Sequence, residues 1–195
     1  TAVIEDSCNC DVSSSFLPQD DAVSRLRMEG WDNAEGGKVS GIEFSAGMPL
    51  FFLPDFMDGL GIDANVSFID SEIDILQRQG DDEKTPFFQQ PSTIANVALW
   101  YQRSGWQARI AWRYQDESFN EVSDPNDSFG DLYKAPRSQF DAQVSYQFTE
   151  NWNAYLNVKN LTNEQDIRWF GNTSSRINEI EEFGRTWRLG VRWNY

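Results

Sequence analysis

The sequence of 195 residues contains no histidine and only two cysteines, Cys8 and Cys10. Without histidine the chain cannot carry serine–histidine chemistry, and the two cysteines alone do not complete a zinc ligand set. Two cysteines are also too few for a disulfide framework, so the pair either forms one small loop disulfide or stays reduced. We therefore expect no enzyme activity, no metal and no other cofactor.

Positive charge and long apolar runs are also scarce. The chain has 16 basic and 31 acidic residues, which gives a net charge of −15. Such a charge argues against nucleic acid and against anionic lipid headgroups as electrostatic partners. The sequence lacks a run of about 18 apolar residues, the length that a transmembrane helix requires. A transmembrane β-barrel stays open, because its strands alternate lipid-facing and lumen-facing residues.

The clearest pattern that is present is the β-strand alternation of apolar and polar residues. The last ten residues, TWRLGVRWNY (186–195), place a bulky apolar side chain at every second position. Six earlier segments alternate in the same way: 39–52, 60–73, 92–102, 106–115, 139–148 and 153–163. The segment 23–31 is a weaker candidate for an eighth strand, because arginines interrupt its pattern. The sequence therefore predicts an all-β, antiparallel fold.

Strand and connection lengths favour a transmembrane barrel wall over a soluble sandwich. Soluble strands average about 5–6 residues, whereas membrane strands need about 9–11, and the segments above are in the longer class. Short turns alternate with long polar stretches at 76–90, 116–136 and 164–184. Short turns at one end and long loops at the other are typical of outer-membrane barrels. In such a wall Trp193 and Tyr195 would lie at the headgroup level, where amphipathic rings are favoured.

Five aromatic residues in or near the long loops are weak candidates for substrate binding. They are Phe87, Phe88, Phe119, Trp169 and Phe170. Their rings could stack on sugars or clamp an apolar ligand. For any one ring, an outer interfacial belt or packing within a loop is the more ordinary interpretation.

The loop 117–133 is rich in acidic and amide side chains that would suit calcium. The candidate ligands are Asp124, Asn126, Asp127 and Asp131. Their spacing fails the EF-hand rule, because Gly130 comes one place late and no Glu stands at the twelfth position. We therefore expect a solvated acidic loop without a bound metal.

Four stretches resemble the β-barrel of TonB-dependent outer-membrane receptors. They are NAEGGKVSGIEFS (33–45), LPDFMDGLGIDANVSFIDSE (53–72), FDAQVSYQFTENWNAYLNVKNLTNE (140–164) and FGRTWRLGVRWNY (183–195). Their wording is similar to the branch seen in Xanthomonas- and Caulobacter-like bacteria, which is often tied to carbohydrate uptake. Each motif is weak alone, but the four occur in order along residues 33–195.

The resemblance implies a fold larger than this chain. Receptors of this family have about 22 strands around a plugged lumen, and a wall of seven or eight strands has two open edges that lipid does not tolerate. The first ten residues lack a signal peptide, so we expect a mature form or a fragment. The expected fragment is the C-terminal portion of the barrel. Residues 1–37 would be an extracellular loop region with a partial strand, and residues 38–195 barrel strands with short periplasmic turns and long extracellular loops.

The closing strand also resembles the signal that the barrel-assembly machinery reads. The matching residues are Arg188, Gly190, Trp193 and Tyr195. The simpler interpretation is a closing strand that needs interfacial aromatics. The other partners that the family implies are outer-membrane lipid, the missing N-terminal plug and remaining strands, and a TonB-type energy protein reached through that missing part.

The expected function is that of a wall segment in an energy-coupled receptor of the bacterial outer membrane. Its long loops would capture a ligand, with carbohydrate as the suggested class, and its lumen would pass the ligand inward. Two alternatives remain open at this point. One is a small complete eight-stranded outer-membrane barrel with a structural or adhesive role. The other is a soluble, calcium-dependent sugar-binding β-sandwich.

Overall fold

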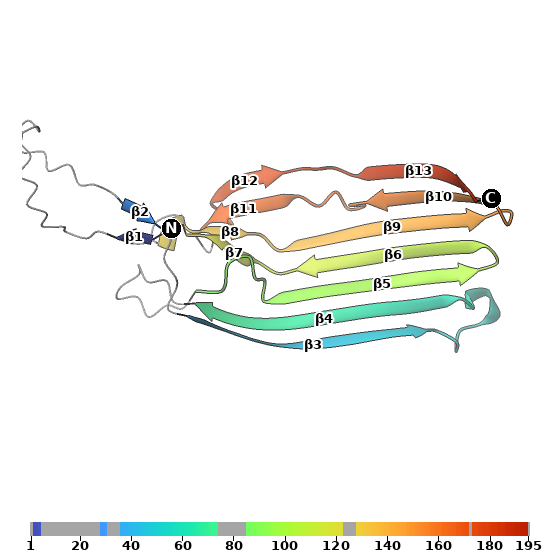
Figure 1. Cartoon of the computed structure of the whole chain (residues 1–195), viewed down its shortest axis with the longest axis horizontal. Coiled ribbons are helices and arrows are strands. Elements are labelled where there is room, and N and C mark those ends of the chain that lie inside the picture. Colours follow the sequence, from blue (N-terminus) through green and yellow to red (C-terminus); the bar gives the residue numbers. More distant parts are fainter. Residues whose placement is uncertain are drawn as a thin grey trace, which may run out of the picture.

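The computed structural model describes residues 2–4, 28–30, 36–73, 85–122, 128–171 and 173–194. Its main element is a seven-stranded antiparallel sheet with the strand order β13-β10-β9-β6-β5-β4-β3. The strands are β3 (Gly37–Pro49), β4 (Leu60–Ile73), β5 (Thr93–Arg103), β6 (Trp106–Gln115), β9 (Arg137–Gln147), β10 (Trp152–Lys159) and β13 (Thr186–Trp193). Figure 1 shows these strands side by side, running along the long axis of the structure.

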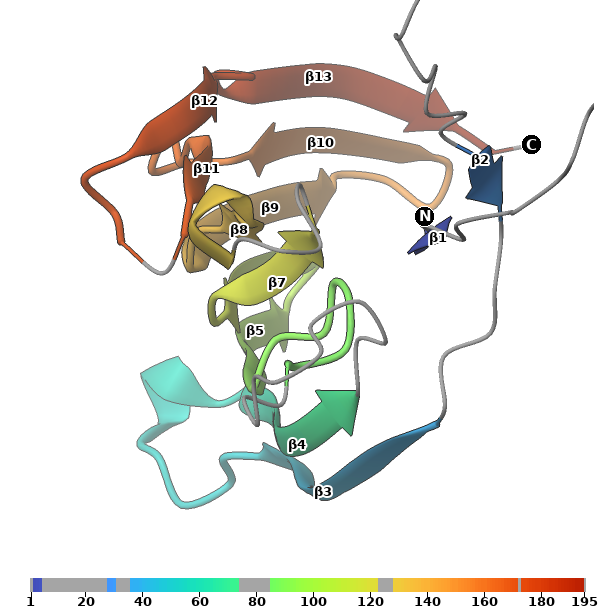
Figure 2. The ribbon, with the colours of Figure 1, turned by 90° about the vertical axis from the view of Figure 1, so that its left-hand side faces the viewer.

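Each of the seven predicted strands is present, and the sheet is one curved layer. The strands predicted at 60–73 and 106–115 have these same bounds as β4 and β6. Figure 2 shows a curved wall with β3 and β13 at its two edges. The described residues therefore do not form the two packed sheets of a sandwich. Their main sheet is also not closed into a small barrel, since β3 and β13 do not pair.

The segment predicted as a doubtful eighth strand lies only partly within the described residues. Its described part is β2 (Met28–Gly30), which pairs with β1 (Ala2–Ile4) in a separate two-stranded sheet. Residues 23–27 and 31 lie outside the described residues, as do Cys8 and Cys10.

Apolar side chains form rows across one face of the curved sheet. In one such row the register pairs Met48 with Ile62, Ile62 with Leu99 and Leu99 with Ile110. The same face continues on β13, where Leu189 is 79% exposed. The opposite face carries the polar partners, such as Asn65 paired with Asn96. Period-two alternation together with in-register pairing therefore gives the wall one apolar and one polar side.

The two ends of the sheet differ in their connections. At the first end, called here the turn end, residues 104–105 and 148–151 are tight turns, and Ser104 and Gly105 take the positive φ values of 50° and 83° that a two-residue hairpin requires. The connection 50–59 also lies at this end and contains the short helix η1 (Asp55–Met57). The opposite end is called the loop end. None of the helices among the described residues is long and apolar enough to cross a membrane.

The loops predicted at 116–136 and 164–184 are wrong in part, because each contains two strands. β7 (Ser118–Glu121), β8 (Leu132–Lys134), β11 (Asp166–Phe170) and β12 (Ile177–Glu181) form a four-stranded sheet with the order β12-β11-β8-β7. It lies beyond the loop end of the main sheet (Figure 1). Pairing of β8 with β11 joins the two segments. These strands are short and set among polar residues, and the pairing of β8 with β11 joins segments distant in sequence, so the local pattern did not reveal them.

Candidate functional site

Asn160 connects the main sheet to the four-stranded sheet. It ends β10 earlier than the predicted 153–163, because its φ is 56°, outside strand geometry. Its backbone N–H donates to the carboxylate of Asp141 (2.9 Å), and its side-chain amide donates to the carbonyls of Glu164 (3.0 Å) and Gly184 (3.1 Å). The Glu164 backbone N–H donates back to Asn160 Oδ1 at 2.7 Å. This side chain therefore fixes the point where both strands of the β11–β12 hairpin leave the main sheet.

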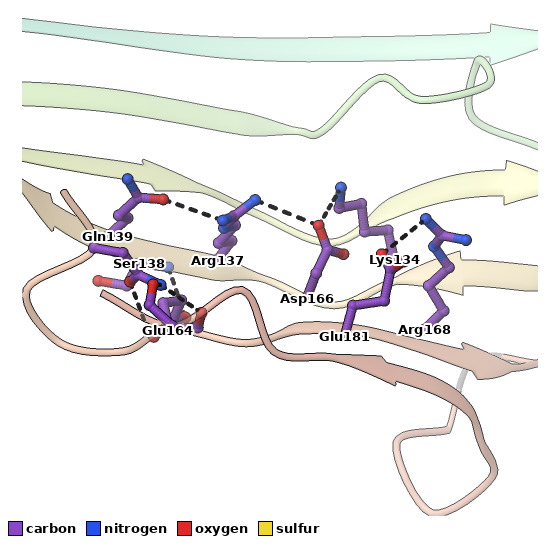
Figure 3. Close-up of polar contacts among 10 residues, drawn as sticks. Lys134, Arg137, Ser138, Gln139, Glu164, Asp166, Arg168 and Glu181 are labelled. Atoms are coloured by element: carbon purple, nitrogen blue, oxygen red, sulfur yellow. Dashed lines mark hydrogen bonds and ion pairs between the residues drawn. The ribbon is translucent and has the colours of Figure 1, made fainter. Parts of the chain in front are cut away.

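A nearly buried ion-pair cluster holds β8, β9 and β11 together. The Asp166 side chain is 8% exposed, and its Oδ2 lies 2.9 Å from Lys134 Nζ and 3.3 Å from Arg137 Nη1. Figure 3 shows both cations directed at this carboxylate from neighbouring strands. A buried carboxylate needs such partners, since desolvation of an unpaired charge is costly.

The remaining basic side chains of this region are engaged as well. Arg168 pairs with Glu179 (2.8 Å) and Glu181 (3.6 Å) across β11 and β12. Arg176 lies over the Phe129 ring, with its guanidinium carbon 3.5 Å from the centroid, and donates to the Phe129 carbonyl. Arg185 donates to the Leu161 carbonyl.

These contacts leave the loop end acidic. Residues 116–122, 128–137 and 164–185, all described except 172, hold nine carboxylates and five basic side chains. Each of the five basic side chains makes one of the contacts above. This part of the chain thus offers a ligand carboxylates, amides and rings, and its cations are already partnered.

Of the five predicted aromatic candidates, the structure brings Phe88 and Phe119 together. Phe119 is 1% exposed, and its ring is stacked on Phe88 at 5.1 Å and tilted on Tyr133 at 5.3 Å. Phe88 is 46% exposed, so it presents the outer ring of this stack.

The other three candidates lie elsewhere. Trp169 is buried in the four-stranded sheet, Phe170 lies 5.8 Å from the Arg176 guanidinium, and the Phe87 backbone donates to Ser71 Oγ. Sequence analysis missed Tyr133 and Arg176 as ring partners, because their contacts depend on the pairing of β7 with β8 and on the approach of Arg176 to Phe129.

Two carboxyl groups at the loop end have shifted pKa values of opposite sign. Burial, followed by the nearby Asp116 charge, raises the pKa of Glu117 above its ordinary value. Hydrogen bonds from the amides of Asn163 (2.6 Å) and Gln165 (3.2 Å) lower the pKa of Glu182, which is on the surface. The fold therefore disfavours the charged form of Glu117 and favours that of Glu182.

The polar face of the main sheet contains a hollow of about 340 Å³. Its charged and amide lining comes from neighbouring strands: Asp63, Asn65, Asn96, Arg109, Arg113 and Asp141. Asn96 donates to Asn65 (2.9 Å), which donates to Glu43 (3.1 Å), so the amides form a ladder across β5, β4 and β3. The hollow places this polar face on the concave side, and the apolar face is the convex side.

Aromatic rings collect at both margins of the convex face. At the turn end, Trp152 approaches Trp193 at 6.2 Å and Phe148 at 6.4 Å, and Trp106 approaches Tyr146 at 4.5 Å. Towards the loop end, Trp112 lies near Phe140 and Tyr114. Trp106 and Trp112 are six residues apart on β6, which separates the two rows by about 20 Å. This spacing is of the order of the roughly 25 Å apolar band that aromatic girdles flank in membrane barrels.

The structure places three of the four predicted assembly-signal residues on β13. Trp193 belongs to the aromatic row of the turn end, while Arg188 lines a polar recess on the concave face. Gly190 faces Tyr155 of β10 in the register. Tyr195 lies outside the described residues.

The predicted calcium ligands are only partly visible. Asp131 is 1% exposed, whereas Asp124, Asn126 and Asp127 lie outside the described residues. Within the described ranges, acidic, cysteine and histidine side chains do not gather in threes as a metal site would need. The absence of a bound metal stays a prediction.

Comparison with known proteins identifies the family. Residues 9–161, more than half of the chain, match the family model described as TonB dependent receptor-like, beta-barrel. The chain therefore belongs to the TonB-dependent receptor β-barrel family. None of the curated proteins matches it.

Two solved structures resemble the fold. The crystal structure of the siderophore receptor PiuA from Acinetobacter baumannii has a TM-score of 0.57 and 19% sequence identity, over 82% of this chain and 22% of that one. The crystal structure of the ferric citrate transporter FecA in its unliganded form has a TM-score of 0.60 and 18% sequence identity. The match covers 80% of this chain and 24% of that one. At these identities the likeness concerns the fold alone. The chain thus spans less than a quarter of the length of either structure.

Family and fold together define the setting of the two faces. The chain is part of the wall of a transmembrane β-barrel in the outer membrane of a Gram-negative bacterium. Its convex face, with aromatic rows at both margins, meets lipid, and its polar concave face lines the barrel interior. The family is one of receptors and transporters.

Proposed function

We propose that this chain is the C-terminal portion of the barrel of an energy-coupled receptor that captures a ligand at the loop end and imports it. One observation carries the proposal: a convex apolar face between two aromatic rows backs onto a concave polar face with a hollow. In this proposal the loop end is extracellular and the turn end periplasmic. Residues 1–37 are an extracellular loop region, and residues 38–195 supply the barrel strands.

The concave face suits a polar partner inside the barrel. Arg109, Arg113 and Asp141 line the hollow beside the Glu43–Asn65–Asn96 ladder. We assign this surface to contact with an N-terminal plug that belongs to the rest of the receptor, and through that part the receptor would engage a TonB-type energy protein. The chain itself would hold and guide the ligand without catalysing a reaction.

The ligand we propose for this chain is a neutral carbohydrate. Carboxylates outnumber basic side chains at the loop end, and those basic side chains are partnered, so an anionic ligand would meet repulsion there. Phe88 offers an exposed ring to a sugar face. Phe119 stacks on the Phe88 ring from the buried side, while Phe87, Trp169 and Phe170 lie elsewhere and are weaker candidates. The motif wording of the Xanthomonas- and Caulobacter-like branch points in the same direction.

Binding to the gene product that carries this chain, in isolated outer membranes, tests the proposal. We expect a panel of neutral oligosaccharides to include a binder, and Phe88→Ala to weaken its binding about tenfold, which corresponds to roughly 1.4 kcal/mol. Phe51→Ala, at the opposite end of the barrel, is the matched control and should leave binding unchanged. Binding of an anionic ferric chelate but of no neutral sugar would contradict the ligand assignment.

A further inference from the structure

The connection between β3 and β4 differs from the other turns at its end of the barrel. Residues 104–105 and 148–151 make tight turns, whereas residues 50–59, LFFLPDFMDG, make a ten-residue excursion. Phe51 and Phe52 in this excursion are 83% and 77% exposed. Two adjacent phenylalanines this open to the surroundings are unusual on a surface that meets only water.

Part of the backbone of the excursion is paired internally. The Leu50 backbone N–H donates to the carbonyl of Leu60, and that of Leu53 donates to the carbonyl of Leu50. The short helix η1 follows, with the Met57 N–H donating to the Pro54 carbonyl at 2.7 Å. A segment that enters the edge of a bilayer needs such internal pairing, because unsatisfied backbone groups are costly there.

The position of the excursion indicates what covers it. It continues directly from Met48, which lies on the convex, lipid-facing side and is 53% exposed. Figure 2 shows the segment between β3 and β4 on the outer side of the curved sheet, and residues 50–59 do not line the hollow. The excursion lies at the same end as the Trp106–Tyr146 and Trp152–Trp193 aromatic pairs (Figure 1). Its surface is thus continuous with the established lipid interface.

Apolar and acidic residues occupy different parts of the excursion. Asp55 and Asp58 are exposed, and residues 50–59 contain no basic side chain. Phe51 and Phe52 stand at the start of the excursion, and the two carboxylates follow in and after the η1 segment, where they favour water. A segment with an apolar part and an acidic part fits the boundary between acyl chains and headgroups.

We propose that residues 50–59 form an interfacial finger that inserts Phe51 and Phe52 into the lipid leaflet at the turn end of the barrel. The partner is the bilayer itself. The inference rests on the outer-membrane barrel and not on the identity of the ligand. Its leaflet is the periplasmic one in the orientation proposed above. The finger would fix the depth of the β3–β4 hairpin, which forms the edge of the described sheet.

An environment-sensitive fluorophore on single cysteines tests the finger. The gene product that carries this chain would be prepared with Cys8→Ser and Cys10→Ser, purified and reconstituted in phosphatidylethanolamine–phosphatidylglycerol vesicles. Probes would be attached at Phe52→Cys, and at Phe51→Cys as a second finger position. Leu99→Cys on the convex face and Ser104→Cys in the β5–β6 turn are the controls. Nitroxide-labelled lipids and aqueous iodide serve as the two quenchers.

We expect the probes at 51 and 52 to be quenched by shallow nitroxide lipid and shielded from iodide, like the probe at 99, while the probe at 104 behaves in the opposite way. A probe at 52 quenched by iodide as strongly as that at 104 would overturn the finger. Shielding from both quenchers would also overturn it, because a protein and not lipid would then cover the site. A probe at 99 untouched by lipid quenchers would overturn the barrel location itself, which distinguishes the two failures.

Discussion

The ring of Tyr155 lies over the backbone of Gly190. The two residues are cross-strand partners on β10 and β13, and a Cβ atom added to Gly190 would collide with the tyrosine ring. Trp100 covers Gly61 in the same way on β5 and β4. Each large ring on the concave face is therefore accommodated by a glycine on the neighbouring strand. This gives Gly190 a packing role in addition to its place in the proposed assembly signal.

The first prediction follows from this contact. Gly190→Val should lower the free energy of unfolding of the micelle-folded gene product by about 1–3 kcal/mol, because the tyrosine ring has to move. Tyr155→Ala in the same chain should remove most of that loss. Urea unfolding followed by heat-modifiable gel mobility provides the measurement. A loss that is the same with and without Tyr155 would show that the ring is not the cause.

The second prediction concerns the buried ion-pair cluster. Asp166→Asn should destabilise the four-stranded sheet by about 3 kcal/mol, because it leaves Lys134 and Arg137 without their carboxylate in a largely buried place. Glu179→Gln, which weakens the more exposed pair with Arg168, should change stability by less than about 1 kcal/mol. Hydrogen exchange of β8 and β11 amides reports the local stability. Equal effects of the two substitutions would contradict the burial argument.

A third prediction uses the opposite pKa shifts at the loop end. The raised pKa of Glu117 means that its carboxylate opposes folding at neutral pH and that the opposition disappears as the pH falls below the ordinary glutamate pKa. Glu117→Gln should therefore stabilise the protein at neutral pH and lose this advantage in acid.

Glu182 provides the matched comparison to Glu117. Its lowered pKa means that its carboxylate contributes stability at neutral pH, which is lost as the pH falls. Glu182→Gln should destabilise the protein at neutral pH, and in acid it should have no effect on stability. Urea unfolding at several pH values compares each variant with the parent, and two differences of the same sign at neutral pH would refute the assignment.

The fourth prediction concerns the end of the chain. If the assembly machinery reads the closing strand, Tyr195→Ala and Trp193→Ala should lower the amount of receptor assembled in the outer membrane. Arg192→Ala, whose side chain belongs to the concave face, should lower it less. Ligand affinity per assembled molecule should stay unchanged, because β13 ends at the turn end, away from the loop end. Surface labelling measures assembled protein, and equal amounts for Tyr195→Ala and the parent would remove the signal interpretation.

The seven long strands could be predicted because their pattern is local. In the segment 106–115, every second residue is apolar, and a strand that separates lipid from a polar interior has to alternate in this way. The same reasoning placed β4 at its observed bounds. It overextended β10, because the turn at Asn160 depends on amide hydrogen bonds to Glu164 and Gly184, which a strand pattern does not encode.

The loop end could not be predicted, because it depends on contacts between distant segments. β8 pairs with β11, about 35 residues further along, and the Phe119 ring is buried against Phe88 and Tyr133 from two other segments. The sequence marked Phe88 and Phe119 as loop aromatics without showing that they stack. The packing of the β7–β8 hairpin against the segment around Phe88 distinguishes the buried ring from the exposed one.

The central claim is that the convex face meets lipid and the concave face meets the barrel interior. A nitroxide scan of β6, residues 106–115, in the gene product held in outer-membrane vesicles tests it most directly. Oxygen is enriched in the acyl region, so we expect accessibility to oxygen to peak at the even-numbered positions, such as Ile110. Accessibility to a water-soluble nickel complex should be higher at the odd-numbered positions, such as Arg109, which face the barrel interior. An oxygen profile without period-two alternation, or with its maxima at the odd positions, would contradict the account.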